Sequence, residues 1–210
     1  MVVLHHTAMR DCAGALERLC DPASEVSCHY LIGEDGTIWQ LVDEEMRAWH
    51  AGAGCWGGVR DVNSHSIGIE LANPGPNASH PPFAEKQMAA LESLLADIIA
   101  RRDIRPENVL AHSDTAPRRK ADPGPGFDWR RLALAGLSVW PEGGGAESAA
   151  DQAAFLRHAE RFGYCPDAGF EPVLAAFRLR FRPTASGPLV GADMAMMAEL
   201  ASRWPARLSP

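Results

Sequence analysis

The segment that most constrains the fold is residues 83–102, a long amphipathic stretch set between two short apolar runs. Its apolar residues recur at helical spacing and form one stripe: Met88, Leu91, Leu94, Leu95, Ile98 and Ile99. Before it, "SIGIEL" at residues 66–71 alternates as a strand does, with Glu70 on the face opposite the apolar residues. After it, "ENVLAH" at residues 107–112 reads as another strand. Strands interleaved with helices predict an α/β fold.

The rest of the first 140 residues agrees with this class. Strand signals recur at residues 2–4, 29–32 and 37–42. The first of these runs into His5 and His6, and the other two flank "GEDG", which predicts a hairpin. Residues 11–20 have helical spacing. Residues 43–65 show no apolar period and predict a long loop, which in a compact domain is usually functional.

A change of composition marks a second unit. "PEGGGAES" at residues 141–148 predicts a linker, because its glycines and polar residues disfavour regular structure. Three helices are predicted beyond it, at residues 149–162, 170–181 and 192–203. We therefore expect a larger domain over residues 1–140, which folds without the tail, and a small all-α domain over residues 149–210.

Composition excludes some classes of function. A net charge of −7 argues against a nucleic-acid-binding surface, and no apolar run is long enough to cross a membrane. The five cysteines are odd in number and lack CxxC spacing, so we expect reduced thiols. The chain opens on a strand rather than a leader, which predicts a cytoplasmic protein, or a periplasmic one if its N-terminus is truncated.

Several chemically active side chains stand at or near the predicted strand ends. His5 and His112 each end a strand, and Glu70 lies within a third. Lys120 and Asp122 follow in a loop rich in proline and glycine. Strand ends at one edge of a sheet can converge, and two imidazoles with a carboxylate suit zinc. Spacing alone leaves three alternatives open, namely surface histidines, a solvated basic loop and an outward-facing strand carboxylate.

Five stretches occur in order along residues 1–140: "VVLHHTA", "SCHYLIGEDGTIWQLVDEEMRAWHAG", "NSHSIGIELAN", "AEKQMAALESLLADII" and "RPENVLAHSDTAPRRKADPGPGFDW". They resemble the type-2 N-acetylmuramoyl-L-alanine amidases, a zinc family shared with peptidoglycan-recognition proteins. The tail, with "LRHAERFGY", "VLAAFRLRFRP" and "MMAELA", more loosely resembles a three-helix peptidoglycan-binding domain. The resemblance implies a mixed central sheet flanked by helices, followed by a small all-α domain.

The resemblance also implies roles for individual residues. His5, His112 and Asp122 match the zinc ligands, with the first histidine of the pair as the ligand. Glu70 matches the catalytic acid, and Lys120 matches the position that supports the oxyanion. The implied activity is zinc-dependent hydrolysis of the amide between N-acetylmuramic, or anhydromuramic, acid and L-alanine.

Substrate contacts are implied less sharply. His6 is expected to line the cleft, and Asn73 either contacts substrate or caps a turn. Trp49, His50 and Trp56 lie in the long loop, where the family binds sugar and peptide, with packing as an equal alternative. The expected partner is peptidoglycan or a muropeptide, bound by a monomer. A non-catalytic peptidoglycan-recognition module is the alternative function, and the choice between intact wall and soluble anhydromuropeptide stays open.

Overall fold

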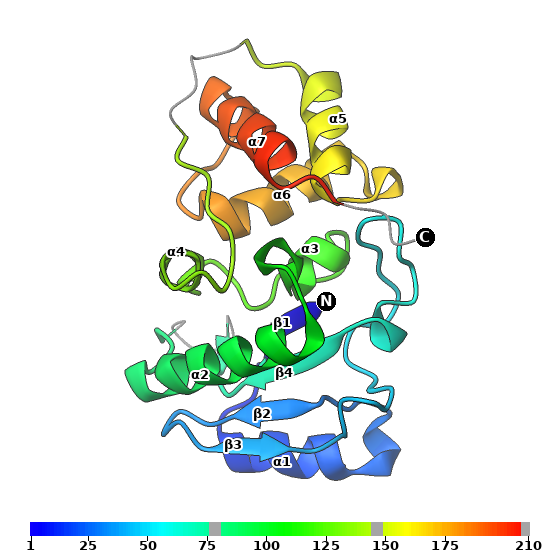
Figure 1. Ribbon diagram of the computed structural model, residues 1–210, viewed down its shortest axis with the longest axis vertical. Helices are drawn as coiled ribbons and strands as arrows, with labels where there is room; N and C mark the ends of the chain where they lie inside the picture. Colours follow the sequence, from blue (N-terminus) through cyan, green and yellow to red (C-terminus); the bar gives the residue numbers. More distant parts are fainter. Residues whose placement is uncertain (76–80, 144–148, 207–210) are drawn as a thin grey trace.

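The computed structural model describes residues 1–75, 81–143 and 149–206 (Figure 1). Its centre is a five-stranded sheet with the strand order β3-β2-β4-β1-β5. The strands are β1 (Val2–His6), β2 (Tyr30–Ile32), β3 (Ile38–Gln40), β4 (Ile67–Leu71) and β5 (Val109–Ala111). Neighbouring strands run parallel except β2 and β3, which pair antiparallel. The predicted mixed sheet is therefore confirmed.

Seven α-helices surround this sheet within the described ranges: α1 (Cys12–Cys20), α2 (Glu85–Arg102), α3 (His112–Thr115), α4 (Trp129–Leu134), α5 (Gln152–Phe162), α6 (Phe170–Phe181) and α7 (Gly191–Arg203). Two details differ from prediction. His112 does not end a strand, because β5 stops one residue earlier and His112 begins α3. The six-residue helix α4 was not predicted, since it is too short to show a helical period.

Different segments pack on the two faces of the sheet. The apolar stripe of α2 packs on one face, in a core that also holds Leu4 and Ile69. Side chains alternate along β1, so Val3 and His5 face the other way. There Val3 packs with Ala51 and Val62 of the long loop. This second face carries the chemically active residues.

The C-terminal helices, defined as α5, α6 and α7, lie together at one end of the molecule, with α3 between them and the sheet (Figure 1). They do not stand apart, because their core also includes Trp56, Leu110 and Val139 from the first 140 residues. The backbone N–H of Gly143 donates to Glu199 on α7. Residues 144–148 of the predicted linker lie outside the described residues. No helix in the described ranges combines the length and apolar character needed to cross a bilayer.

A disulfide also links the C-terminal helices to the first 140 residues. Cys55 of the long loop is bonded to Cys165, which follows α5, at a sequence separation of 110 and with 5.9 Å between their Cα atoms. The expectation of reduced thiols is wrong for this pair, although Cys12, Cys20 and Cys28 are free. Packing of the C-terminal helices on the loop brings the two cysteines together, and local spacing carries no sign of it.

Candidate active site

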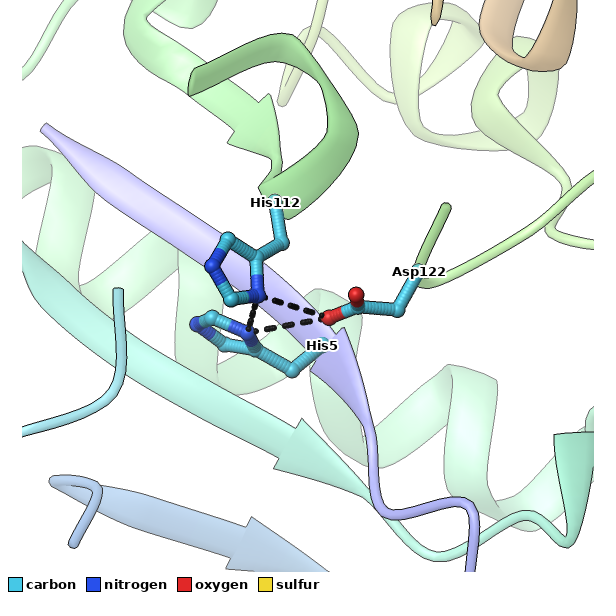
Figure 2. A group of neighbouring side chains, drawn as sticks. All are labelled: His5, His112 and Asp122. Carbon is cyan, nitrogen blue, oxygen red and sulfur yellow. Dashed lines mark hydrogen bonds and ion pairs between the residues drawn. The ribbon is translucent and has the colours of Figure 1, made fainter. Parts of the chain in front are cut away.

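Three side chains predicted as metal ligands converge on one point (Figure 2). His5 Nδ1 lies 2.9 Å from His112 Nδ1 and 3.1 Å from Asp122 Oδ2. His112 Nδ1 lies 3.0 Å from the same carboxylate oxygen. The three residues come from the end of β1, the first position of α3 and the loop after α3. Segments more than a hundred residues apart in sequence thus supply one compact set of donor atoms.

This triangle suits a single metal ion, since its three donor atoms lie within 4.8 Å of one another. Zinc bonds to nitrogen and oxygen are about 2.0–2.1 Å long, so tetrahedral ligands stand roughly 3.3 Å apart. The observed separations of 2.9 to 3.1 Å are close to that value. Two imidazoles and one carboxylate leave a fourth coordination position for water or substrate.

The electrostatics keep the ligands ready to bind a cation. Burial, and then the charge of His112, lower the pKa of His5 to about 4, so its imidazole is neutral at neutral pH. Burial alone would raise the pKa of Asp122, but hydrogen bonds with His112 and His5 outweigh it and lower that pKa. Neutral imidazoles and an ionised carboxylate are the forms that coordinate a metal.

Residues of the long loop contact the Nε2 atom of each imidazole and so orient both rings. His5 Nε2 lies 3.0 Å from His50 Nδ1, and His112 Nε2 donates to the backbone carbonyl of Ala51 at 2.9 Å. The loop is fixed in turn by Asn63, whose Oδ1 accepts from the N–H groups of both loop residues. Sequence reasoning missed Asn63, which carries no local signal. For His50 the sequence left substrate contact and packing open, and the structure places its ring against His5 and within the pocket lining.

Glu70 lies beside the metal ligands because of strand register. It pairs with His5 across the parallel strands β1 and β4, so both side chains project from the same face. Its Oε2 is buried and has no hydrogen-bond partner among the described residues. Burial, and then the charge of Asp122, raise the pKa of Glu70 to about 8, while Lys120 acts to lower it. An unpaired buried carboxyl at this position is suited to exchange protons with a reactant.

One pocket of about 260 Å³ contains these groups. The site residues predicted from the sequence that line this pocket are His5, His6, Trp49, His50, Glu70, His112, Lys120 and Asp122. Trp49 stands at the rim with 53% of its surface exposed. Sequence reasoning missed the contribution of α1, which lines the pocket with Ala15, Arg18 and Leu19. The helical spacing of residues 11–20 was the available signal, but it did not show which surface the helix would face.

Two residues predicted to bind substrate lie elsewhere. Trp56 is 2% exposed and packs edge-on against Phe162 and Tyr164 of the C-terminal part, which favours the packing alternative over a substrate contact. Asn73 is buried, and its side chain accepts from Gly75 N–H and donates to the Pro81 carbonyl. These hydrogen bonds make Asn73 a turn cap, the other alternative left open by the sequence.

Comparisons with known proteins agree with this site. The model of the N-acetylmuramoyl-L-alanine amidase family matches residues 1–125. The chain is 39% identical to the N-acetylmuramoyl-L-alanine amidase AmiD of Escherichia coli over 225 residues, covering 95% of this chain and 80% of AmiD. A solved complex of E. coli AmiD with anhydro-N-acetylmuramic acid-L-Ala-D-gamma-Glu-L-Lys has a TM-score of 0.89 at 37% identity, covering 99% of this chain and 90% of that one. AmpDh3 of Pseudomonas aeruginosa, in complex with an anhydromuramic pentapeptide, has a TM-score of 0.87 at 33% identity, covering 98% and 92%.

A mixed sheet that places a His/His/Asp set beside a buried glutamate is an arrangement suited to metal-assisted hydrolysis of an amide. With the family match over residues 1–125, the chain belongs to the N-acetylmuramoyl-L-alanine amidase family. Its activity is hydrolysis of the amide between N-acetylmuramic acid and L-alanine. The prediction of an enzyme, rather than a non-catalytic recognition module, is confirmed.

Proposed function

We propose that this amidase depends on zinc and cleaves soluble anhydromuramyl peptides as well as muropeptides released from peptidoglycan. The observation that carries the proposal is the convergence of the His5, His112 and Asp122 donor atoms beside the unpaired carboxyl of Glu70. Support for the substrate class comes from two relatives, AmiD and AmpDh3, whose solved complexes contain anhydromuramyl peptides.

The zinc would be held by His5 Nδ1, His112 Nδ1 and Asp122 Oδ2. Bound there, a zinc ion would supply Lewis acidity: it would lower the pKa of a water to about 7 and would polarise the scissile carbonyl. His50 and Ala51 keep the two imidazoles facing this point, each through the ring nitrogen on the far side from the metal. Such outer hydrogen bonds fix the tautomer of a ligand histidine and strengthen its bond to the metal.

Glu70 is the general base and then the general acid in this proposal. Its carboxylate takes a proton from the attacking water and returns a proton to the amine of the departing L-alanine. Burial and the raised pKa favour both transfers near neutral pH, because a catalytic group works best when its pKa is close to the working pH.

Lys120 supports the negative charge that develops on the carbonyl oxygen. It lines the same pocket as Glu70 and comes from the turn between two ligands, His112 and Asp122. An ammonium group aimed at a developing oxyanion stabilises the transition state more than the bound substrate.

The pocket rim supplies the substrate contacts. Trp49 presents an exposed ring to bind the sugar or the first residues of the stem peptide, and His6, at the end of β1, also lines the pocket. The groups given roles in this proposal all come from a single chain, so the proposed reaction needs no second copy, and we propose a monomer. The Cys55–Cys165 disulfide supports an oxidising compartment, so we favour the periplasm over the cytoplasm.

The decisive test combines metal analysis with product analysis. We expect one zinc per chain in protein purified without chelators, and mass spectrometry should show release of the intact stem peptide from an anhydromuramyl tripeptide. Incubation with a strong chelator should abolish turnover, and added zinc should restore it. Full turnover by the metal-free protein would refute zinc dependence, and a product cut within the peptide would refute the assigned bond. Intact sacculi, digested in parallel, report whether polymer is also a substrate.

A further inference from the structure

The fully buried carboxylate of Asp114 joins the C-terminal helices to the catalytic part. Asp114 lies in α3, two residues after His112, and its Oδ2 accepts from the Ala111 N–H at 2.9 Å. Arg180 of α6 donates to the same oxygen at 2.6 Å, and the hydroxyl of Tyr164 donates to Oδ1, also at 2.6 Å. Two side chains from beyond residue 149 thus hold one side chain of the helix that begins with a metal ligand.

Arg180 has further partners in the same region. Its side chain is fully buried, and its Nη2 donates to the Val109 carbonyl at 3.0 Å and to Ser138 Oγ at 3.1 Å. Its guanidinium carbon lies 4.3 Å from the centre of the Trp129 ring. One side chain of α6 therefore contacts β5, α3 and α4. A buried ion pair needs such hydrogen bonding to offset its desolvation.

The helix that carries His112 depends on outside support. A four-residue helix has no stability of its own, because nucleation costs more than one turn of hydrogen bonds returns. Asp114 holds it at its start, through the N–H of Ala111. At its end, the Thr115 carbonyl accepts from the Cys55 N–H at 2.7 Å. Cys55 is itself bonded to Cys165, next to Tyr164, so both ends of α3 are tied to the C-terminal part.

We propose that Arg180 is a positioning residue for the metal ligand His112, and that the C-terminal helices are therefore part of the metal-binding apparatus. The inference rests on the proposed zinc site. Arg180 acts on the metal indirectly, through Asp114 and through the backbone of Val109 and Ala111, which sets where the His112 side chain begins. Loss of the guanidinium releases this backbone and leaves a buried carboxylate without its charged partner.

The test compares zinc affinity in two full-length variants that each lose a buried arginine of α6. Arg180→Met breaks the pair with Asp114. Arg178→Met breaks a pair of similar burial with Asp193. Arg178 donates to Asp193 and to the carbonyls of Gly187 and Pro188, which all lie within the C-terminal part. Zinc affinity of each apoprotein is measured by competition with a chromophoric chelator, and the unfolding temperature of each apoprotein is measured alongside.

We expect both variants to unfold at lower temperature, while only Arg180→Met binds zinc more weakly, by about 10–100-fold. Wild-type zinc affinity in folded Arg180→Met, or equal losses in both variants, would overturn the inference while leaving the zinc site intact. A wild-type protein that binds no zinc would overturn the proposed function and the inference together. If Arg180→Met does not fold, Tyr164→Phe decides, since it removes one neutral hydrogen bond to Asp114. A several-fold loss of zinc affinity supports the inference, and wild-type affinity overturns it.

Discussion

His50 Nδ1 lies 3.0 Å from His5 Nε2, on the opposite side of the His5 ring from Asp122. With a metal on His5 Nδ1, the proton of that ring must sit on Nε2 and point at His50. His50 Nε2 then faces Ser66 Oγ, 3.4 Å away, which donates to the Val62 carbonyl at 2.6 Å. The hydrogen bonds run in one direction, from the metal ligand to the loop backbone.

Removal of His50 should therefore weaken metal binding. We expect His50→Ala to lower zinc affinity by about 10–100-fold, because His5 loses the partner that fixes its tautomer. His65→Ala is the matched control, since the His65 ring is exposed and hydrogen-bonds to the backbone carbonyl of the nearby Asp61. Chelator competition on both apoproteins is the measurement. Equal affinities would show that His50 does not orient the ligand.

Substitution of Glu70 should slow the chemistry and spare the metal. Glu70→Gln keeps the shape of the side chain and removes the base, so we expect kcat to fall on the order of 10²–10⁴-fold with one zinc still bound. The measurement is turnover of a defined muramyl peptide together with zinc content. Near-normal turnover with zinc retained would require another base.

Glu70 should also shape the stability of the metal-free protein. Burial raises its pKa to about 8 in the folded protein from the ordinary value of 4.5, so the folded state holds an extra proton between these two pH values. The free energy of unfolding contributed by this group therefore falls as pH rises through that window. We expect Glu70→Gln to reduce the pH dependence of apoprotein unfolding and to raise stability at the alkaline end. Denaturant titrations across the window provide the comparison, and parallel curves for the two proteins would contradict it.

Lys120 should influence both the rate and its pH profile. We expect Lys120→Met to lower kcat on the order of 10²–10³-fold through loss of an oxyanion donor. The acid limb of the kcat profile should move to higher pH, because the ammonium that lowers the pKa of Glu70 is gone. Lys86→Met is the control, since Lys86 is the only other lysine in the chain and is exposed on α2. An unshifted acid limb would argue against coupling between Lys120 and Glu70.

Deletion of the C-terminal part should do more than remove a binding module. Sequence composition led us to expect that residues 1–140 fold alone, but the structure leads to the opposite expectation. A chain ending at Gly143 would expose Trp56 and Leu110 and would leave Asp114 buried without Arg180. We expect it to aggregate or to unfold without cooperativity, as judged by light scattering and thermal melting. A truncated chain that stays monomeric and shows a sharp thermal unfolding transition would support the expectation that residues 1–140 fold alone.

The metal set and the sheet could be predicted because their signals lie in the chain itself. The alternation around Glu70 and the stripe on residues 83–102 fix the elements, and the family motifs carry the ligands. The contacts between the C-terminal helices and the first 140 residues could not be predicted in this way. Cys55 and Cys165 are 110 residues apart, and Arg180 and Asp114 are separated by 66, so neither pair leaves a local pattern.

Loop residues were predicted unevenly for a related reason. Trp49 and Trp56 stand seven positions apart in the same loop, yet one lies at the rim of the pocket and the other lies in the core beneath the C-terminal helices. The backbone around Trp49 is held by Ser27, which donates its N–H to the Trp49 carbonyl. Such tertiary contacts decide which tryptophan is exposed to solvent. The local sequence does not distinguish the two, because both are tryptophans in the same loop.

The pairing of His5 with Glu70 across β1 and β4 makes the catalytic centre sensitive to insertions and deletions as well as to substitutions. Adjacent residues of a strand point to opposite faces, so one residue added between Ile67 and Glu70 would turn the carboxyl into the apolar layer under α2. The same change would bring Ile69 to the metal side. The length of β4 up to Glu70 is therefore held by the geometry of the sheet, whatever side chains stand at its other positions.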